Sequence, residues 1–87
     1  MTQTTPSKPR SYSKPATQAE HDFYRAFVAQ LKAKRKQLGM SEDALGRLIG
    51  VSDRLVFKWE NSTRYPGSFS LCCWAMALGV RMKIEDV

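Results

Sequence analysis

The amino-acid sequence predicts an all-α fold: a compact four- to five-helix bundle with a helix-turn-helix, preceded by a disordered basic arm. Apolar residues recur at helical spacings of three and four positions between residues 17 and 79. Glycines and good capping residues separate these segments where helices should end and begin. Residues 1–16 lack such a pattern. We therefore expect two parts, a flexible basic arm over residues 1–16 and a helix-turn-helix domain over residues 17–87.

The expected arm is rich in Pro, Ser and Thr and contains no acidic residue. Such a composition cannot bury enough apolar surface to offset the entropy lost on folding. The arm holds half of the net charge of +6, on Lys8, Arg10 and Lys14. These residues could track the backbone or the minor groove of DNA. A solubilising tail or an inter-domain remnant would explain them equally well.

A long first helix is expected over residues 17–38. Thr17 and Glu20 form a T-x-x-E capping box at its start, and Gly39 follows its end. The apolar residues at helical spacing are Phe23, Tyr24, Phe27, Val28, Leu31 and Leu38. A basic cluster fills the last turns, at Lys32, Lys34, Arg35 and Lys36. This cluster suits the negative end of a helix and would also suit a phosphate, although most of it is expected to be a solvated face.

Residues 40–61 predict two short amphipathic helices joined by a tight turn at Gly50. Ser41 is a good N-cap for the first of them, and Gly50 can adopt a positive φ that ends it. Its apolar stripe consists of Leu45, Leu48 and Ile49. Gly46 suits the close approach of two crossing helices, at a cost of about 1 kcal/mol in helix propensity relative to alanine.

The second helix of this pair is expected to begin with Ser52 as its cap. Its apolar residues Val56 and Trp59 are three positions apart, whereas Arg54 and Lys58 lie four apart on another side. One side can therefore pack against a core while the other contacts something negative. An ordinary helical hairpin in a small bundle is the alternative interpretation.

A fourth helix is expected from about Ser68 or Ser70 up to Gly79. Its core stripe would consist of Leu71, Trp74, Ala75 and Leu78. Three apolar residues off that stripe, Phe69, Cys73 and Met76, are left for a fifth element or a partner, and we predict them as a dimer surface. Residues 81–87 are too few to decide between a helical turn and a strand.

Length and composition exclude several classes of function. The 87 residues leave room for one domain. No apolar run approaches the ~20 residues that span a bilayer, and the N-terminus lacks a secretory signal, so no membrane contact is expected. The adjacent Cys72 and Cys73 lack the spacing of a zinc site or an ordinary disulfide, and packing thiols explain them better than a redox switch.

An enzyme is the weakest interpretation. His21 has no nucleophile near it in sequence, and the chain contains no phosphate-binding glycine loop, HExxH motif or paired-carboxylate motif. We expect no catalytic residue, no metal, no cofactor and no small-molecule ligand. The positive net charge instead favours nucleic acid or another anionic partner, although many small proteins share it.

From Leu31 to Val80 the chain resembles the DNA-binding domain of the lambdoid phage repressor and Cro family. Several motifs fall in register: LKAKRKQLGMS, ALGRLIGVS, the W-E-N run that begins at Trp59, Pro66 and MALGV. The resemblance implies a domain of four or five helices that binds operator DNA, commonly as a dimer, with the third helix in the major groove.

The resemblance also implies roles for individual residues. An arginine late in the first helix pairs with the glutamate that ends the third, which implies a pair between Arg35 and Glu60. The base-reading positions become Asp53, Arg54, Leu55 and Lys58. The positions near the DNA backbone become Arg35, Ser41, Glu42, Ser52, Asn61, Thr63, Arg64 and Tyr65.

The side chains at these positions have suitable chemistry for DNA. Arg54 could bond the O6/N7 edge of guanine, Asp53 could accept from a cytosine amino group, and Leu55 could press on a thymine methyl. Glu42 departs from the family, in which a glutamine is usual, and its carboxylate would repel a phosphate unless a cation neutralises it. Glu42 and Asp53 together make the basic arm more important than in typical relatives.

These expectations combine into a sequence-specific double-stranded DNA-binding transcriptional regulator, a repressor or autoregulator. It would read operator DNA in the major groove through its third helix, as a homodimer, in the cytoplasm and associated with the nucleoid. The alternative is a protein-interaction module on the same fold, such as an antitoxin or adaptor, whose partner would dock on the apolar residues of the fourth helix.

Overall fold

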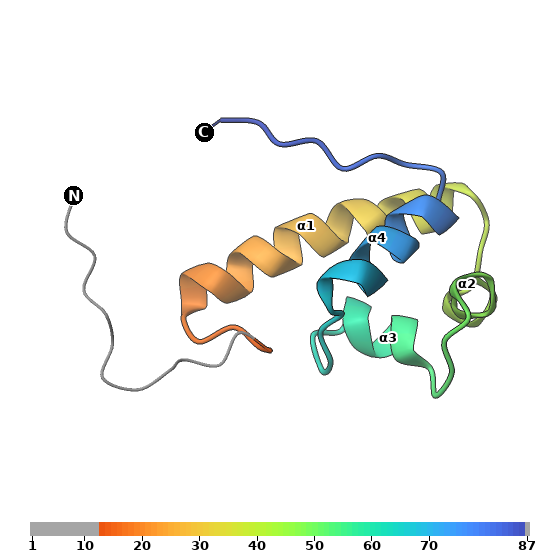
Figure 1. Ribbon diagram of the computed structural model, residues 1–87, viewed down its shortest axis with the longest axis horizontal. Helices are drawn as coiled ribbons and strands as arrows, with labels where there is room; N and C mark the ends of the chain where they lie inside the picture. The colour runs from red at the N-terminus through yellow and green to blue at the C-terminus, as the bar shows by residue number, and fades with distance from the viewer. Residues whose placement is uncertain (1–12, 87) are drawn as a thin grey trace.

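A computed structural model describes residues 13–86, and in this part of the chain it contains four helices. They are α1 (Gln18–Gln37), α2 (Glu42–Ile49), α3 (Leu55–Glu60) and α4 (Ser68–Ala77). The three short helices gather against the C-terminal half of the long α1, and residues 80–86 run back along α1 without regular structure (Figure 1). The predicted all-α bundle is confirmed, with four helices in the described residues.

The beginning of α1 follows the predicted capping box. The Thr17 hydroxyl accepts a hydrogen bond from the Glu20 amide at 3.1 Å, and the Glu20 carboxylate accepts from the Thr17 amide at 3.3 Å. Of the basic residues expected in the arm, Lys14 is exposed, whereas Lys8 and Arg10 lie outside the described residues. Val28 and Leu31 are the buried apolar residues of α1.

The predicted signals of α2 are confirmed at both of its ends. The Ser41 hydroxyl accepts a hydrogen bond from the Ala44 amide at 3.0 Å, and Gly50 ends the helix with φ at +89°. Its stripe is only partly buried, since Leu45 is fully enclosed and Leu48 remains 64% exposed. Leu48 therefore adds to the apolar surface of the protein and contributes little to the core.

The predicted start of α3 is wrong, because Ser52 does not cap this helix. Asp53 and Arg54 both adopt left-handed backbone conformations, with φ of +59° and +55°, and α3 begins only at Leu55. A left-handed residue cannot continue a right-handed helix, so these two residues lengthen the turn after α2. Ser52 contributes its carbonyl to that turn, where it accepts from the Leu55 amide at 3.1 Å.

The core joins all four helices around two tryptophans. The most enclosed side chains are Leu45, Val56, Trp59 and Trp74. The ring centroids of Trp59 and Trp74 lie 5.3 Å apart, which connects α3 directly to α4. The cap of α4 differs from the prediction, since Gly67 precedes the helix and no side chain caps it.

Gly46 gives a first testable prediction. A Cβ atom at this position would lie 3.7 Å from the Val51 carbonyl oxygen and 3.8 Å from the nearest methyl carbons, which is ordinary contact. We therefore expect Gly46→Ala to raise the free energy of unfolding by about 0.5–1 kcal/mol, since alanine is the better helix former. Gly50→Ala is the matched control: it should lower that energy by about 1–2 kcal/mol, because the backbone at Gly50 is left-handed. Urea unfolding measures both, and a destabilising Gly46→Ala would contradict the contact distances.

Candidate nucleic-acid interface

The exposed side of α3 and of the turn before it carries most of the predicted base-reading side chains. Asp53 and Arg54 are exposed, and Lys58 is half-buried. Leu55 differs, because it packs against the core cluster. The Arg54 guanidinium lies 4.2 Å from the centre of the Phe57 ring, which holds this cation at the beginning of the helix. Sequence reasoning missed Phe57, although its spacing of three positions from Arg54 could have indicated the contact.

A buried ion pair fixes α3 to α1. Arg35 donates from Nε and from one terminal nitrogen to the two carboxylate oxygens of Glu60, at 2.8 and 3.0 Å. Its other terminal nitrogen donates to the Met40 carbonyl at 2.7 Å, which also ties down the segment before α2. The side chains of Arg35 and Glu60 are only 9% and 0% exposed. The pair implied by the family resemblance is therefore present, and Arg35 holds α3 in place from inside the protein.

Glu42 lies beside this pair at the beginning of α2. Burial raises the pKa of its carboxyl above the ordinary value, and the neighbouring Glu60 carboxylate raises this pKa further, by charge repulsion and through a hydrogen bond between the two side chains. Arg35 and Lys32 act in the opposite direction. The surroundings of Glu42 therefore disfavour the ionised form of its carboxyl group.

We expect Glu42→Gln to raise stability at pH 7, by less than about 1 kcal/mol because the side chain is partly solvated. With a raised pKa, the folded protein binds more protons than the unfolded chain, so stability falls as pH increases through the folded-state pKa. Urea unfolding between pH 4 and 8 should show a smaller decline in the variant. Asp43→Asn removes the exposed neighbouring charge as a control, and an equal effect of both substitutions would contradict the assigned role of Glu42.

The loop after α3 is held firmly against the end of that helix. The amides of Thr63 and Arg64 donate to the Lys58 carbonyl at 3.0 and 3.3 Å. The Asn61 side chain donates to the Phe57 carbonyl at 2.8 Å. Because the backbone N–H groups of Thr63 and Arg64 are already hydrogen-bonded, an anion that approaches the loop would meet its side chains.

Two tyrosines connect the loop to α1. The Tyr65 hydroxyl donates to the Ser62 carbonyl at 2.9 Å, and its ring meets that of Tyr24 edge-on with centroids 4.9 Å apart. The Tyr24 hydroxyl donates to the Trp59 carbonyl at 2.7 Å. Tyr65 is therefore partly committed to holding the loop in position.

The other positions predicted near the DNA backbone are spread around α3. Ser52, Asn61, Thr63 and Arg64 are exposed, as is Ser41, whose hydroxyl also caps α2. A groove of about 400 Å³ brings Glu42 together with Ser52, Asp53 and Arg54. Arg54 thus lines the same groove as Glu42, although the cations that act on the Glu42 carboxyl are Arg35 and Lys32.

A second polar groove was not foreseen. It has a volume of about 360 Å³ and is lined by His21, Arg25 and Lys32 of α1 together with Glu60, Asn61 and Ser62. Sequence reasoning considered His21 only as a possible catalytic residue and Lys32 only as part of a largely solvated basic cluster, and it did not single out Arg25. Their spacing of four and seven positions, which puts them on one face of a helix, is the signal that could have found the groove.

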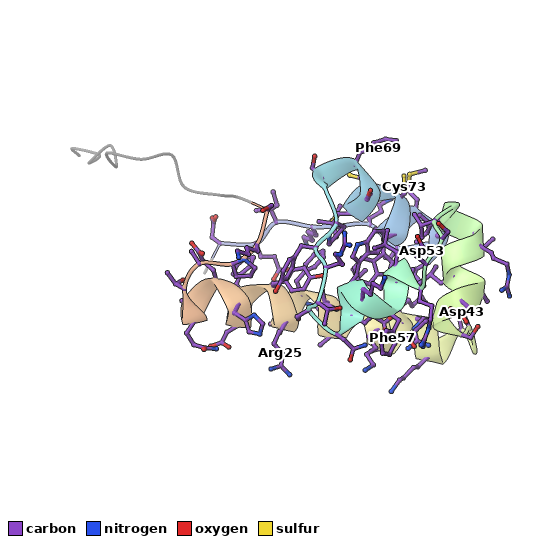
Figure 2. The ribbon with its side chains drawn as sticks, turned by 90° about the horizontal axis from the view of Figure 1, so that it is seen from below. Arg25, Asp43, Asp53, Phe57, Phe69 and Cys73 are labelled. Carbon is purple, nitrogen blue, oxygen red and sulfur yellow. The ribbon has the colours of Figure 1, made fainter. Side chains whose placement is uncertain are left out.

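The apolar side of α4 lies away from these grooves. Phe69 and Met76 are 79% and 76% exposed, and Cys73 is half-buried. Cys72 is exposed, so the expectation that both cysteines are packing thiols is wrong for this residue. In Figure 2, Phe69 and Cys73 lie at the opposite edge of the molecule from Arg25 and Phe57.

Within residues 13–86, no helix is long and apolar enough to cross a membrane. In the same residues, no three His, Cys, Asp or Glu side chains lie close enough together to hold a metal ion.

Comparisons with known proteins agree on the kind of domain. A family model described as Helix-turn-helix matches residues 31–83, more than half of the chain. The chain is also similar to Repressor protein C2 of Salmonella phage P22, with 35% identity over 49 residues. That segment covers 56% of this chain but only 23% of the phage repressor. No solved structure shows significant similarity to the chain.

Proposed function

The chain belongs to the helix-turn-helix family of lambdoid phage repressors and Cro proteins, which are DNA-binding regulators, and we propose that it is a sequence-specific regulator of transcription. It acts as a repressor or autoregulator and reads operator DNA in the major groove through α3. The observation that carries this proposal is the exposed cationic side of α3 and its preceding turn, fixed to α1 by the buried pair of Arg35 and Glu60.

Base reading falls to the residues at the beginning of α3. The Arg54 guanidinium, oriented by the Phe57 ring, suits bidentate hydrogen bonding to a guanine edge. Asp53 supplies an acceptor for a cytosine amino group, and Lys58 reaches a base or a phosphate one turn later. Leu55 is the weakest of these assignments because it packs against the core cluster.

Backbone contacts come from the side chains around both ends of α3. Arg64 supplies a charge, and the hydroxyls of Ser41 and Ser52 and the side-chain amide of Asn61 supply hydrogen bonds to phosphate oxygens. The Thr63 hydroxyl, which donates to the Lys58 carbonyl at 3.3 Å, would give up that bond to do the same. Lys8, Arg10 and Lys14 add sequence-independent attraction along the duplex. Such contacts set the position of the protein on DNA without choosing the sequence.

A homodimer is part of the proposal. Phe69, Cys73 and Met76 follow one another on α4 at spacings of four and three residues, and α4 contains no charged residue. Two copies can therefore bring these faces together without placing like charges in direct contact. A dimer would bind two half-sites about 34 Å apart, one turn of DNA.

The same face of α4 favours one other function, a module that binds a different protein, such as an antitoxin or adaptor. Such a module would not depend on Arg54 or Lys58 of the α3 region, because its partner would bind α4, whereas the regulator needs both residues. Neither function needs a catalytic step, a cofactor or a small-molecule ligand. The regulator would act where the DNA is, in the cytoplasm with the nucleoid.

Selection of binding sites from random duplex DNA by the purified protein tests the proposed function. A dimeric regulator should enrich a palindromic motif at near-physiological salt, with a guanine at a fixed position if Arg54 reads a base edge. Failure to enrich any motif, together with retention of a protein partner by α4, would favour the interaction module.

A further inference from the structure

We propose that the face of α1 formed by His21, Arg25 and Lys32 is a second binding site for the DNA backbone, beside the loop after α3. The inference rests on the proposed DNA binding and extends it to His21 and Arg25, which precede the family match that begins at residue 31. The ligand is a phosphate group of duplex DNA, and the main contact is Arg25.

The geometry places these three side chains in one row. They lie four and seven positions apart on α1, and a helix that rises 1.5 Å per residue spreads them over about 16 Å. They line one groove with Asn61 and Ser62. Figure 2 shows Arg25 projecting from α1 on the same side of the molecule as Phe57.

The charges around the groove favour an anion. The acidic residue that lines it, Glu60, has both oxygens bonded to Arg35 and a side chain that is fully buried, so its charge is compensated. Asp22, the next residue after His21, does not line the groove, and its carboxylate accepts a hydrogen bond from the side-chain amide of Gln18 at 2.8 Å. Arg25 is exposed whereas Lys32 is half-buried, so Arg25 is the cation of this groove most accessible to a phosphate.

The position of the groove suits the path of a DNA strand. Asn61 lines it, and Thr63 and Arg64 follow in the same loop, which is fixed to the end of α3 by its hydrogen bonds to the Phe57 and Lys58 carbonyls. A strand whose phosphates contact this loop would continue along α1. A row of about 16 Å can face more than one phosphate of that strand, whose charges are spaced about 3.4 Å along the duplex axis.

The test measures the dissociation constant of the selected duplex over a range of salt concentrations for Arg25→Ala and for Lys34→Ala. Lys34 is a matched control, because it carries the same charge on the same helix but lines a groove with residues 80–83 and Glu85. Loss of one phosphate contact should lower the slope of log affinity against log salt by about 0.9 and weaken binding roughly fivefold to tenfold at 0.1 M salt. Lys34→Ala should have a smaller effect than Arg25→Ala on both the salt slope and the affinity.

Two further variants and a repeated selection of binding sites distinguish failure of the Arg25 contact from failure of the proposed function. Arg25→Lys should retain the salt slope, and Arg25→Ala should enrich the same motif as the wild-type protein, because a phosphate contact carries no base information. Equal effects of Arg25→Ala and Lys34→Ala, or a changed motif in Arg25→Ala, would overturn this inference while the role of α3 stands. If reversal of the Arg54 and Lys58 charges also leaves binding intact, the proposed function itself fails.

Discussion

Reversal of two charges, Arg54→Glu with Lys58→Glu, is expected to abolish specific DNA binding, with a loss of affinity of at least about 100-fold. Each well-formed contact of a basic side chain with a base edge contributes about 1–3 kcal/mol to discrimination, and two new carboxylates would repel the phosphates in addition. Both residues lie at or near the surface of the α3 region, so the fold should survive. Fluorescence anisotropy with the selected duplex measures the loss.

The matched control for this pair is Arg81→Glu with Lys83→Glu. It makes the same change in net charge, at exposed positions in the segment that follows α4. It should reduce binding only through the general attraction between protein and DNA, which salt screens. A loss as large as that of the α3 variant would mean that net charge governs binding and that α3 reads no sequence.

Removal of one partner from the buried ion pair is expected to have the largest effect on stability. Arg35→Met leaves the fully buried Glu60 carboxylate without its cation, and removing one member of a buried pair costs about 3–5 kcal/mol. That is a large fraction of the 5–15 kcal/mol that typically stabilises a domain. Urea unfolding at pH 7 measures the change in the free energy of unfolding.

Two controls isolate the buried charge as the cause. Combining Arg35→Met with Glu60→Leu should restore much of the lost stability, because the unpaired charge is then absent. Lys83→Met breaks the exposed ion pair of Lys83 with Glu85, whose atoms are 3.8 Å apart, and should change stability by no more than about 0.5 kcal/mol. A double variant as unstable as Arg35→Met alone would show that packing of the Arg35 side chain, rather than its charge, is what the core requires.

The helices that were predicted correctly have signals close together in sequence. Thr17 and Glu20 are three residues apart, and Ser41 and Gly50 enclose a single short helix, so capping rules located both α1 and α2 to within a residue. The Helix-turn-helix match confirms the family suggested by the motifs between Leu31 and Val80.

The remaining features depend on contacts that no local pattern encodes. Asp53 and Arg54 adopt left-handed conformations without a glycine to announce them, so the start of α3 was placed too early. Arg35 and Glu60 are twenty-five positions apart, and only the family resemblance suggested their pairing. Helical spacing could have shown that His21, Arg25 and Lys32 share one face of α1, but not that the loop after α3 folds back to close a groove beside them.

An NMR titration tests most directly whether this chain reads duplex DNA with the exposed side of α3. Amide chemical shifts of the 87-residue protein would be followed as the selected duplex is added. The proposed function predicts the largest changes at residues 53–58 and in the loop at residues 61–65, with further changes around Arg25. Large changes confined to α4, with residues 53–58 unaffected, would contradict it.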